Sequence, residues 1–147
     1  MTALPRKADT ILLADDEPYN LQWVVEFLED KDYKVSVVDK VDFAIRQLQE
    51  IQFRAVIADL SIPLLIPDSF LEGKDPLFQR YPGLLIAEYA RNHGHLGRQV
   101  IVYSVHDDPM VHTVAKRIGC TYLLKGRPRQ FKEELEDVLS YDPLAQR

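Results

Sequence analysis

Cysteine is nearly absent from this sequence, and Cys120 is the only one it contains. A single thiol cannot form an internal disulfide, so we expect a reduced, intracellular protein. Long apolar runs are also missing, and the first residues lack the apolar stretch of a signal peptide. A membrane span and a secreted protein are therefore not expected, and we predict a cytoplasmic location.

Basic residues are also fewer than acidic ones. Eighteen lysines and arginines stand against 23 aspartates and glutamates, which gives a net charge of −5 and argues against a general binder of nucleic acid or membrane surfaces. The sequence has no glycine-rich Walker motif, so nucleotide hydrolysis is not expected either. Hydrophobic residues make up 46% of the 147 residues, enough for one domain with a packed core over residues 1–147.

Five short apolar segments alternate along the chain with stretches of helical spacing. They predict strands over residues 10–14, 33–38, 55–59, 100–104 and 121–124. Helices should follow, capped or opened by Pro18, by Asp39 or Asp42, near Leu84, by Asp107 or Asp108 with Pro109, and by Pro128. Residues 1–9 look like a polar lead-in, and residues 141–147 like a tail that frays. Five β-α repeats predict one parallel sheet with helices on both faces and right-handed crossovers.

Polar side chains stand where four of the five expected strands end. The apolar run 55–58 shows no alternation, as in a strand buried on both faces, and it ends in Asp59. The other polar strand ends are Asp15 with Asp16, Ser104, and Lys125. The carboxyl ends of parallel strands share one edge, where open α/β sheets bind their ligands, so we expect these side chains to converge there.

Three carboxylates in one crevice repel each other unless they share protons or bind a cation. An all-oxygen site suits Mg2+, and the lack of His and Cys at these strand ends argues against zinc. A carboxylate can also attack phosphorus and form an aspartyl phosphate. The ammonium group of Lys125 and the hydroxyl group of Ser104 could then stabilise the phosphoryl oxygens. The strand ends therefore predict Mg2+ as cofactor and phosphoryl transfer as the chemistry.

The same residues carry a resemblance to a known family. Segments 12–18 (LLADDEP), 56–63 (VIADLSIP), 101–104 (IVYS) and 119–125 (GCTYLLK) are similar, in this order, to the receiver domain of two-component response regulators. The resemblance covers about residues 8–140. It implies an α/β fold of the flavodoxin-like kind, with a doubly wound five-stranded parallel sheet in the order 2-1-3-4-5 and five helices.

The resemblance also implies roles at the acidic strand ends. Asp59 would be the phosphoacceptor. Asp15 and Asp16 would bind Mg2+ together with Asp59. The backbone carbonyl of Ser61 would be a further metal ligand.

The remaining implied roles concern signalling. Lys125 would contact the phosphoryl group, Ser104 would be the hydroxyl switch residue, and Tyr122 would be the aromatic residue that changes rotamer. The domain would not be an enzyme; it would take its phosphoryl group from a sensor histidine kinase or a histidine phosphotransfer protein. It would then signal to a downstream protein, or to a second copy of itself, through the face of its fourth helix, fifth strand and fifth helix.

Other interpretations of the same residues remain open. A receiver-fold module could bind partners without phosphate. A phosphatase of the haloacid-dehalogenase type would also use an aspartyl nucleophile, but it would need a second aspartate where this chain has Ser61. Taken singly, Asp15 could be a helix cap, Lys125 a solvated charge, and Tyr122 a core residue. The histidines are interpreted as surface or helix-face residues rather than ligands: His93, His95, His106 and His112.

The largest departure from the family pattern is an insertion over residues 64–82. The glycine expected to open the third helix, Gly83, stands 20 positions after Pro63. The aromatic and aliphatic content of the insertion argues against a wholly solvated coil, and loops of this length are often functional. We hypothesise that it packs beside the crevice and limits the access of partner or water to it. A passive decoration is the alternative.

Smaller departures adjoin the expected site. After the switch hydroxyl the family has a small residue, whereas this chain has Val105, whose bulk would narrow the access of a phosphodonor. His106 follows, which would put a titratable side chain at the rim. After Lys125 the family has a proline, whereas this chain has Gly126. In the family the bond before that proline is generally cis, and a cis bond before Gly126 would be costly even though glycine tolerates unusual backbone angles. The identity of the lysine is therefore better specified than its position.

Overall fold

A computed structural model describes residues 4–66 and 70–144, without the side chains of Pro18, Asn20 and Leu21. Five parallel strands form one sheet in the order β2-β1-β3-β4-β5, which confirms the flavodoxin-like order 2-1-3-4-5. The strands are β1 (Arg6–Ala14), β2 (Lys34–Val38), β3 (Gln52–Asp59), β4 (Val100–Ser104) and β5 (Thr121–Leu124).

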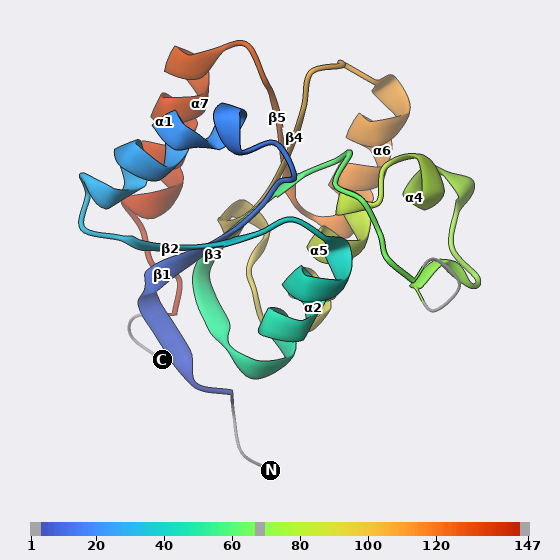
Figure 1. The fold of residues 1–147 in the computed structure, drawn as a ribbon, viewed down its shortest axis with the longest axis horizontal. Coiled ribbons are helices and arrows are strands. Elements are labelled where there is room, and N and C mark those ends of the chain that lie inside the picture. The colour runs from blue at the N-terminus through green and yellow to red at the C-terminus, as the bar shows by residue number, and fades with distance from the viewer. Residues whose placement is uncertain (1–3, 67–69, 145–147) are drawn as a thin grey trace.

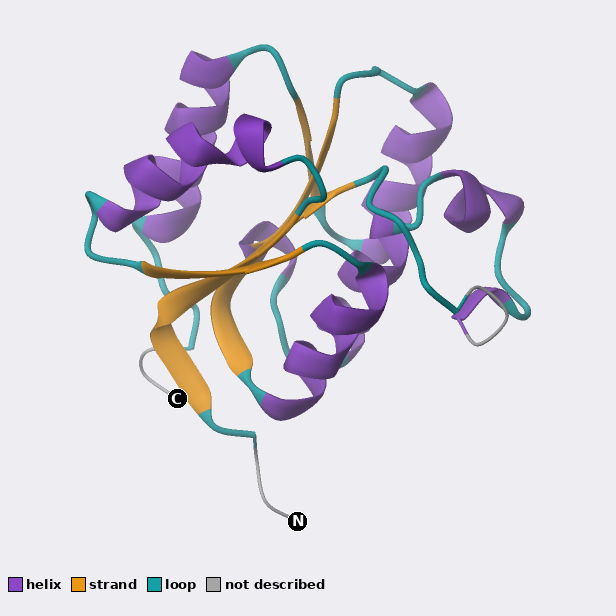
Figure 2. Cartoon of the chain, viewed as in Figure 1, coloured by secondary structure: helices purple, strands orange, loops and turns teal. Residues whose placement is uncertain are grey.

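Helices cover both faces of the sheet (Figures 1 and 2). One face carries α1 (Pro18–Glu29) and α7 (Pro128–Leu139). The other carries α2 (Val41–Glu50), α5 (Gly83–Asn92) and α6 (Pro109–Ile118). These five helices were expected. The described residues add a short α4 (Pro76–Arg80) from the insertion and a 3-10 turn, η1 (Gly97–Gln99). Among the described helices, none has both the length and the apolar character that crossing a membrane requires.

The pleat of the strands divides the core into two clusters. Successive side chains of a strand point to opposite faces of the sheet. Leu13, Ile57 and Ile101 pack in the cluster under α1 and α7, whereas their neighbours Ala58 and Val102 pack in the cluster under α2, α5 and α6. Both faces are buried, which explains why the sequence shows apolar runs without alternation.

The sheet begins earlier than the sequence indicates. Arg6 in β1 pairs with Gln52 in β3, so the expected polar lead-in is wrong for residues 6–9. The expected frayed tail is also wrong where it is described. The buried guanidinium group of Arg54 donates to the carbonyl oxygens of Leu139 (2.8 Å) and Tyr141 (2.9 Å). A buried cation needs such partners, so Arg54 holds the chain after α7 in place. Residues 1–3 and 145–147 lie outside the described part.

Only one of the two expected helix caps is found. Asp108 caps α6 by accepting a hydrogen bond from the Met110 N–H group (2.9 Å). At α2, neither Asp39 nor Asp42 is the cap, because Lys40 stands at that position without a side-chain hydrogen bond. The Asp42 carboxylate instead accepts from the N–H group of Leu65 (2.7 Å) in the insertion. This acidic side chain therefore anchors the first residues of the insertion.

The insertion between β3 and α5 is part of the core. Leu77 and Phe78 of α4 are buried in the cluster under α2, α5 and α6. Lys74 forms an ion pair with Glu88 of α5, and the Tyr81 hydroxyl donates to the Asp108 carboxylate at the start of α6 (3.1 Å). The insertion is therefore not a solvated coil, which confirms the expectation from its aromatic and aliphatic content. Residues 67–69 lie outside the described part.

His95 does not lie at the surface, contrary to the sequence interpretation. The side chain is buried: Nε2 accepts from the Phe53 N–H group of β3 (3.0 Å), and Nδ1 lies 3.3 Å from the Ala90 carbonyl oxygen of α5. The ring is thus neutral, with the Nδ1 proton facing Ala90. Burial lowers the pKa of His95 from 6.5 to about 4. His93, His106 and His112 are exposed, as expected.

The buried His95 predicts a loss of stability in mild acid. Its folded-state pKa lies below its unfolded value, so its contribution is present above pH 6.5 and is lost as the pH falls toward 4. We expect about 2 to 3 kcal/mol of unfolding free energy to be lost from this group between pH 7 and pH 4.5. Urea unfolding of wild type and His95→Gln should therefore show a steeper pH dependence for wild type, with His93→Gln as the exposed control. Equal pH slopes for wild type and His95→Gln would rule this out.

Candidate functional site

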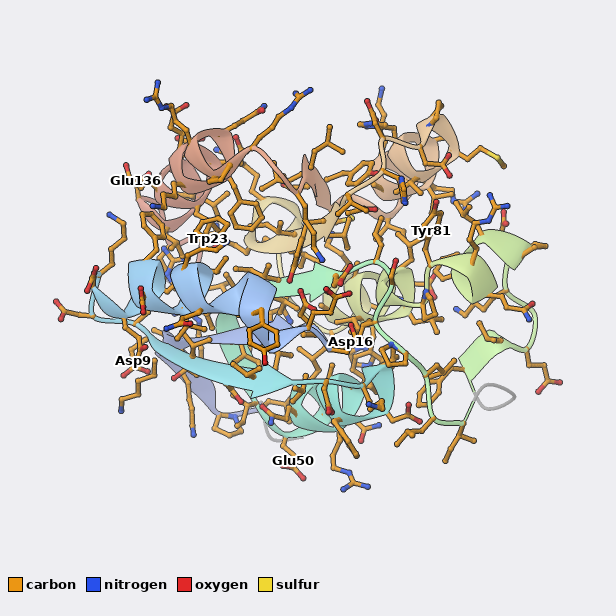
Figure 3. The ribbon with its side chains drawn as sticks, turned by 45° about the horizontal axis from the view of Figure 1, so that its top comes forward. Asp9, Asp16, Trp23, Glu50, Tyr81 and Glu136 are labelled. Carbon is orange, nitrogen blue, oxygen red and sulfur yellow. The ribbon has the colours of Figure 1, made fainter. Side chains whose placement is uncertain are left out.

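Three carboxylates meet at the carboxyl ends of β1 and β3. Ala14 of β1 lies beside Ala58 of β3, so the residues that follow, Asp15 and Asp59, are neighbours. Each of Asp15, Asp16 and Asp59 offers a carboxylate oxygen, and these oxygens lie within 4.8 Å of one another. Asp15 and Asp59 are buried, whereas Asp16 is exposed. Figure 3 shows Asp16 near the centre of the view, between Trp23 on one side and Tyr81 on the other.

Lys125, the residue directly after β5, completes the cluster. Its Nζ lies 3.0 Å from Asp59 Oδ2 and 3.6 Å from Asp15 Oδ2. Its backbone N–H donates to the Ser104 carbonyl oxygen (2.7 Å), so strand pairing continues to the lysine itself. Gly126 then takes a positive φ of 87°, a conformation that favours glycine. The chain thus turns after the lysine on a glycine, and Lys125 is not a solvated strand-end charge.

The charges of the site depend on each other. Burial raises the pKa of Asp59, while the hydrogen bonds from Lys125 and from the Ser61 N–H group (3.1 Å) oppose the rise without cancelling it. Partial burial works to lower the pKa of Lys125, but the hydrogen bond to Asp59 and the charges of Asp59 and Asp15 raise it overall. Lys125 therefore keeps its proton, and a cation near Asp59 would favour the ionised carboxylate.

The two expected switch residues, Ser104 and Tyr122, both contact the loop between β4 and α6. Ser104 ends β4, is buried, and accepts a hydrogen bond from the His106 N–H group (3.1 Å). The Tyr122 hydroxyl donates to the carbonyl oxygen of the same His106 (2.5 Å), and its ring lies 4.5 Å from that of His112. Tyr122 is only partly buried. Both side chains thus contact the segment between β4 and α6.

Sequence reasoning missed Tyr103, which takes part in the cluster. Its hydroxyl group donates to Asp15 Oδ2, and its ring lies under the ammonium group of Lys125, 4.8 Å from Nζ to the centroid. Tyr103 is paired with Asp59 across β4 and β3. The sequence alone carries no signal for it, because the pleat places Tyr103 on the face of Asp59 only once the register between β3 and β4 is known.

The donor set fits Mg2+. Its charged ligands are carboxylates only, and no His or Cys belongs to the group among the described residues. Asp15 Oδ1 accepts from the Glu17 N–H group (2.8 Å) and Asp59 Oδ1 from that of Ser61, so the backbone fixes how both carboxylates are turned. The role expected of the Ser61 carbonyl oxygen stays a prediction.

No family model matches the sequence, and no curated protein matches it. Solved structures do. A CheY-like response regulator receiver domain protein from Methanospirillum hungatei JF-1 is 18% identical with a TM-score of 0.67, over 94% of this chain and 95% of that one. The BeF3-activated receiver domain of RstA from Klebsiella pneumoniae is 19% identical with a TM-score of 0.63, over 90% and 99%.

A third similar structure carries a metal. The receiver domain of the sensor histidine kinase PA1611 from Pseudomonas aeruginosa, with a magnesium ion coordinated in its active-site cleft, is 18% identical with a TM-score of 0.64, over 90% of this chain and 98% of that one. The chain has the fold of response-regulator receiver domains over most of its length. At this level of identity the likeness defines the fold, and the acidic cluster lies where the sheet order places a ligand site.

Proposed function

We propose that this chain is a response-regulator receiver domain that accepts a phosphoryl group on Asp59. The supporting observation is the contact of Lys125 Nζ with Asp59 Oδ2 (3.0 Å) inside a cluster of three carboxylates. A carboxylate beside a cation and further acidic groups is equipped to attack phosphorus rather than to stabilise the fold. The protein would act in the cytoplasm as a signalling domain.

In the proposed reaction, a phosphoryl group passes from a phosphohistidine to Asp59. The N–P bond of a phosphohistidine donor breaks, an Asp59 carboxylate oxygen forms a new P–O bond, and the imidazole leaves with the electron pair of the broken bond. Asp15, Asp16 and Asp59 would hold Mg2+, with the Ser61 carbonyl as a further ligand, and the ion would supply positive charge toward the phosphoryl oxygens. Lys125 would contribute a second positive charge. The donor would be a sensor histidine kinase or a histidine phosphotransfer protein.

Phosphorylation would be read out at the loop after β4. The added negative charge would draw the Ser104 hydroxyl and Lys125 toward Asp59. Ser104 and Tyr122 both hydrogen-bond to His106, so a movement of Ser104 would change the environment of Tyr122. The face formed by α6, β5 and α7 would then favour one of two arrangements and meet a downstream protein or a second copy of the chain.

A mass measurement tests this function. Incubation with Mg2+ and a small phosphodonor is expected to add one phosphoryl group to wild type and none to Asp59→Asn, because the amide is a poor nucleophile. Asp9→Asn, an exposed carboxylate of β1 far from the cluster, is the matched control and should gain the group as wild type does.

The outcome also separates the alternatives. No mass gain in wild type would favour a receiver-fold module that signals without phosphate. Sustained, Asp59-dependent hydrolysis of a generic phosphoester would favour a phosphatase.

A further inference from the structure

The side chain of Tyr103 is fixed in the core directly behind the acidic cluster. It is 4% exposed, and its ring meets Phe131 of α7 edge to face, with centroids 5.7 Å apart. Phe131 in turn meets Trp23 of α1 edge to face at 5.5 Å. These ring contacts hold the tyrosine side chain with its hydroxyl group toward the strand ends, where it contacts Asp15.

The hydroxyl group meets a carboxylate that has no contact with solvent. The Asp15 side chain is 0% exposed. Two hydrogen-bond donors and one cation surround it: the Glu17 N–H group on Oδ1, the Tyr103 hydroxyl group on Oδ2, and the Lys125 ammonium group at 3.6 Å from Oδ2. A buried carboxylate depends on such partners, and the hydroxyl group of Tyr103 is the one among them that comes from β4.

We propose that Tyr103 is a positioning residue for the phosphoryl-transfer site: it orients the Asp15 carboxylate toward the metal position and supports Lys125 beside it. The inference rests on the proposed function. The hydroxyl hydrogen bond fixes the torsion of the Asp15 carboxylate, as groups behind a metal ligand commonly do. The ring face under Nζ adds a cation–π contact that keeps Lys125 close to Asp59. One side chain from β4 thus holds the residues that follow β1 and β5 on either side of the phosphoacceptor.

Core packing alone does not account for a tyrosine here. Phenylalanine would fill the same space between β4 and α7 and make the same contact with Phe131. The hydroxyl group adds a polar atom to a buried place, which is costly unless it is paired. Its partner is a proposed metal ligand rather than a backbone group, so its effect should appear in metal binding.

Tyr103→Phe separates these roles, because it keeps the ring and removes only the donor. Calorimetric titration with Mg2+ alone is expected to give a dissociation constant roughly tenfold or more above that of wild type. The Mg2+ concentration that gives half-maximal phosphorylation should rise by a similar factor, because the lost donor acts through Asp15. Tyr89→Phe, on α5 and stacked on His93, is the control and should bind Mg2+ as wild type does.

A metal-free measurement completes the test. The effects of Tyr103→Phe and Asp15→Ala on the unfolding equilibrium constant should not multiply, and the double variant should fall short of the product by roughly tenfold, because each single change already removes the same hydrogen bond. Multiplicative effects, or an unchanged Mg2+ affinity in Tyr103→Phe, would overturn the inference and leave the proposed function intact. If wild type binds no Mg2+, the positioning role of Tyr103 and the proposed function both fail.

Discussion

Gly83→Ala is expected to lower the unfolding free energy by about 3 kcal/mol and to disable Asp59 as a phosphoacceptor. A Cβ atom at this position would stand 2.2 Å from the Asp59 carbonyl oxygen and 2.8 Å from the Leu60 Cα. Both are backbone atoms, so no side-chain rotation can relieve the clash. The Gly83 N–H group also donates to the Leu60 carbonyl oxygen (3.0 Å), which ties the start of α5 to the end of β3. Relief would require the strand end that carries Asp59 to move.

The measurements are denaturant unfolding and phosphorylation with a small phosphodonor. Gly73→Ala is a suitable control, because its φ of 75° strains an alanine but a Cβ there meets no atom within 4 Å. It should cost about 1 kcal/mol and leave phosphorylation unchanged. If Gly83→Ala matches this control in stability and accepts phosphoryl groups at the wild-type rate, α5 does not depend on close contact with Asp59.

Phe78→Ala should destabilise the protein by about 3 to 5 kcal/mol, although the residue belongs to an insertion. Phe78 is 2% exposed and packs in the core cluster under α2, α5 and α6. The cavity left by the ring lies between elements that are fixed by the sheet, so the space closes only partly. Denaturant unfolding with coincident spectroscopic probes measures the loss.

The neighbouring Gln79→Ala is the control, because Gln79 is exposed on the same short helix. Its effect should stay within about 0.5 kcal/mol. Similar small losses in both variants would mean that α4 rests loosely on the surface. The passive-decoration interpretation of the insertion would then stand.

The sequence predicted the parallel sheet and its polar edge because both follow from local patterns. Apolar runs mark buried strands, and the β-α alternation makes them parallel, so Asp59 and Lys125 had to emerge at one edge. The order of the strands came from the resemblance, since alternation alone does not fix which strands are neighbours. The structure confirmed that order.

The misses concern contacts between residues far apart in the chain. Residues 6–9 are mostly polar and mostly exposed, so no apolar pattern marks them as a strand. His95 is buried because Phe53 and Ala90 supply partners for both ring nitrogens. Tyr103 looked like one more member of an apolar run. Its role becomes visible only when the register sets it opposite Asp59.

The gating hypothesis for the insertion remains untested. Its described polar contacts run to α2, α5 and α6, through Asp42, Glu88 and Asp108. Of these helices, α6 belongs to the face that would carry the signal. The measurement that decides whether the insertion limits access to Asp59 is the lifetime of the phosphoryl group on that residue.

A crystal structure with Mg2+ and beryllofluoride tests the central claim most directly. We expect beryllofluoride on the Asp59 carboxylate, the metal in contact with Asp15 and Asp16, and Lys125 Nζ directed at a fluorine atom. Beryllofluoride bound elsewhere, or absent from Asp59 with the metal site empty at high Mg2+, would contradict the account. The chain would then be a receiver fold that does not carry phosphate.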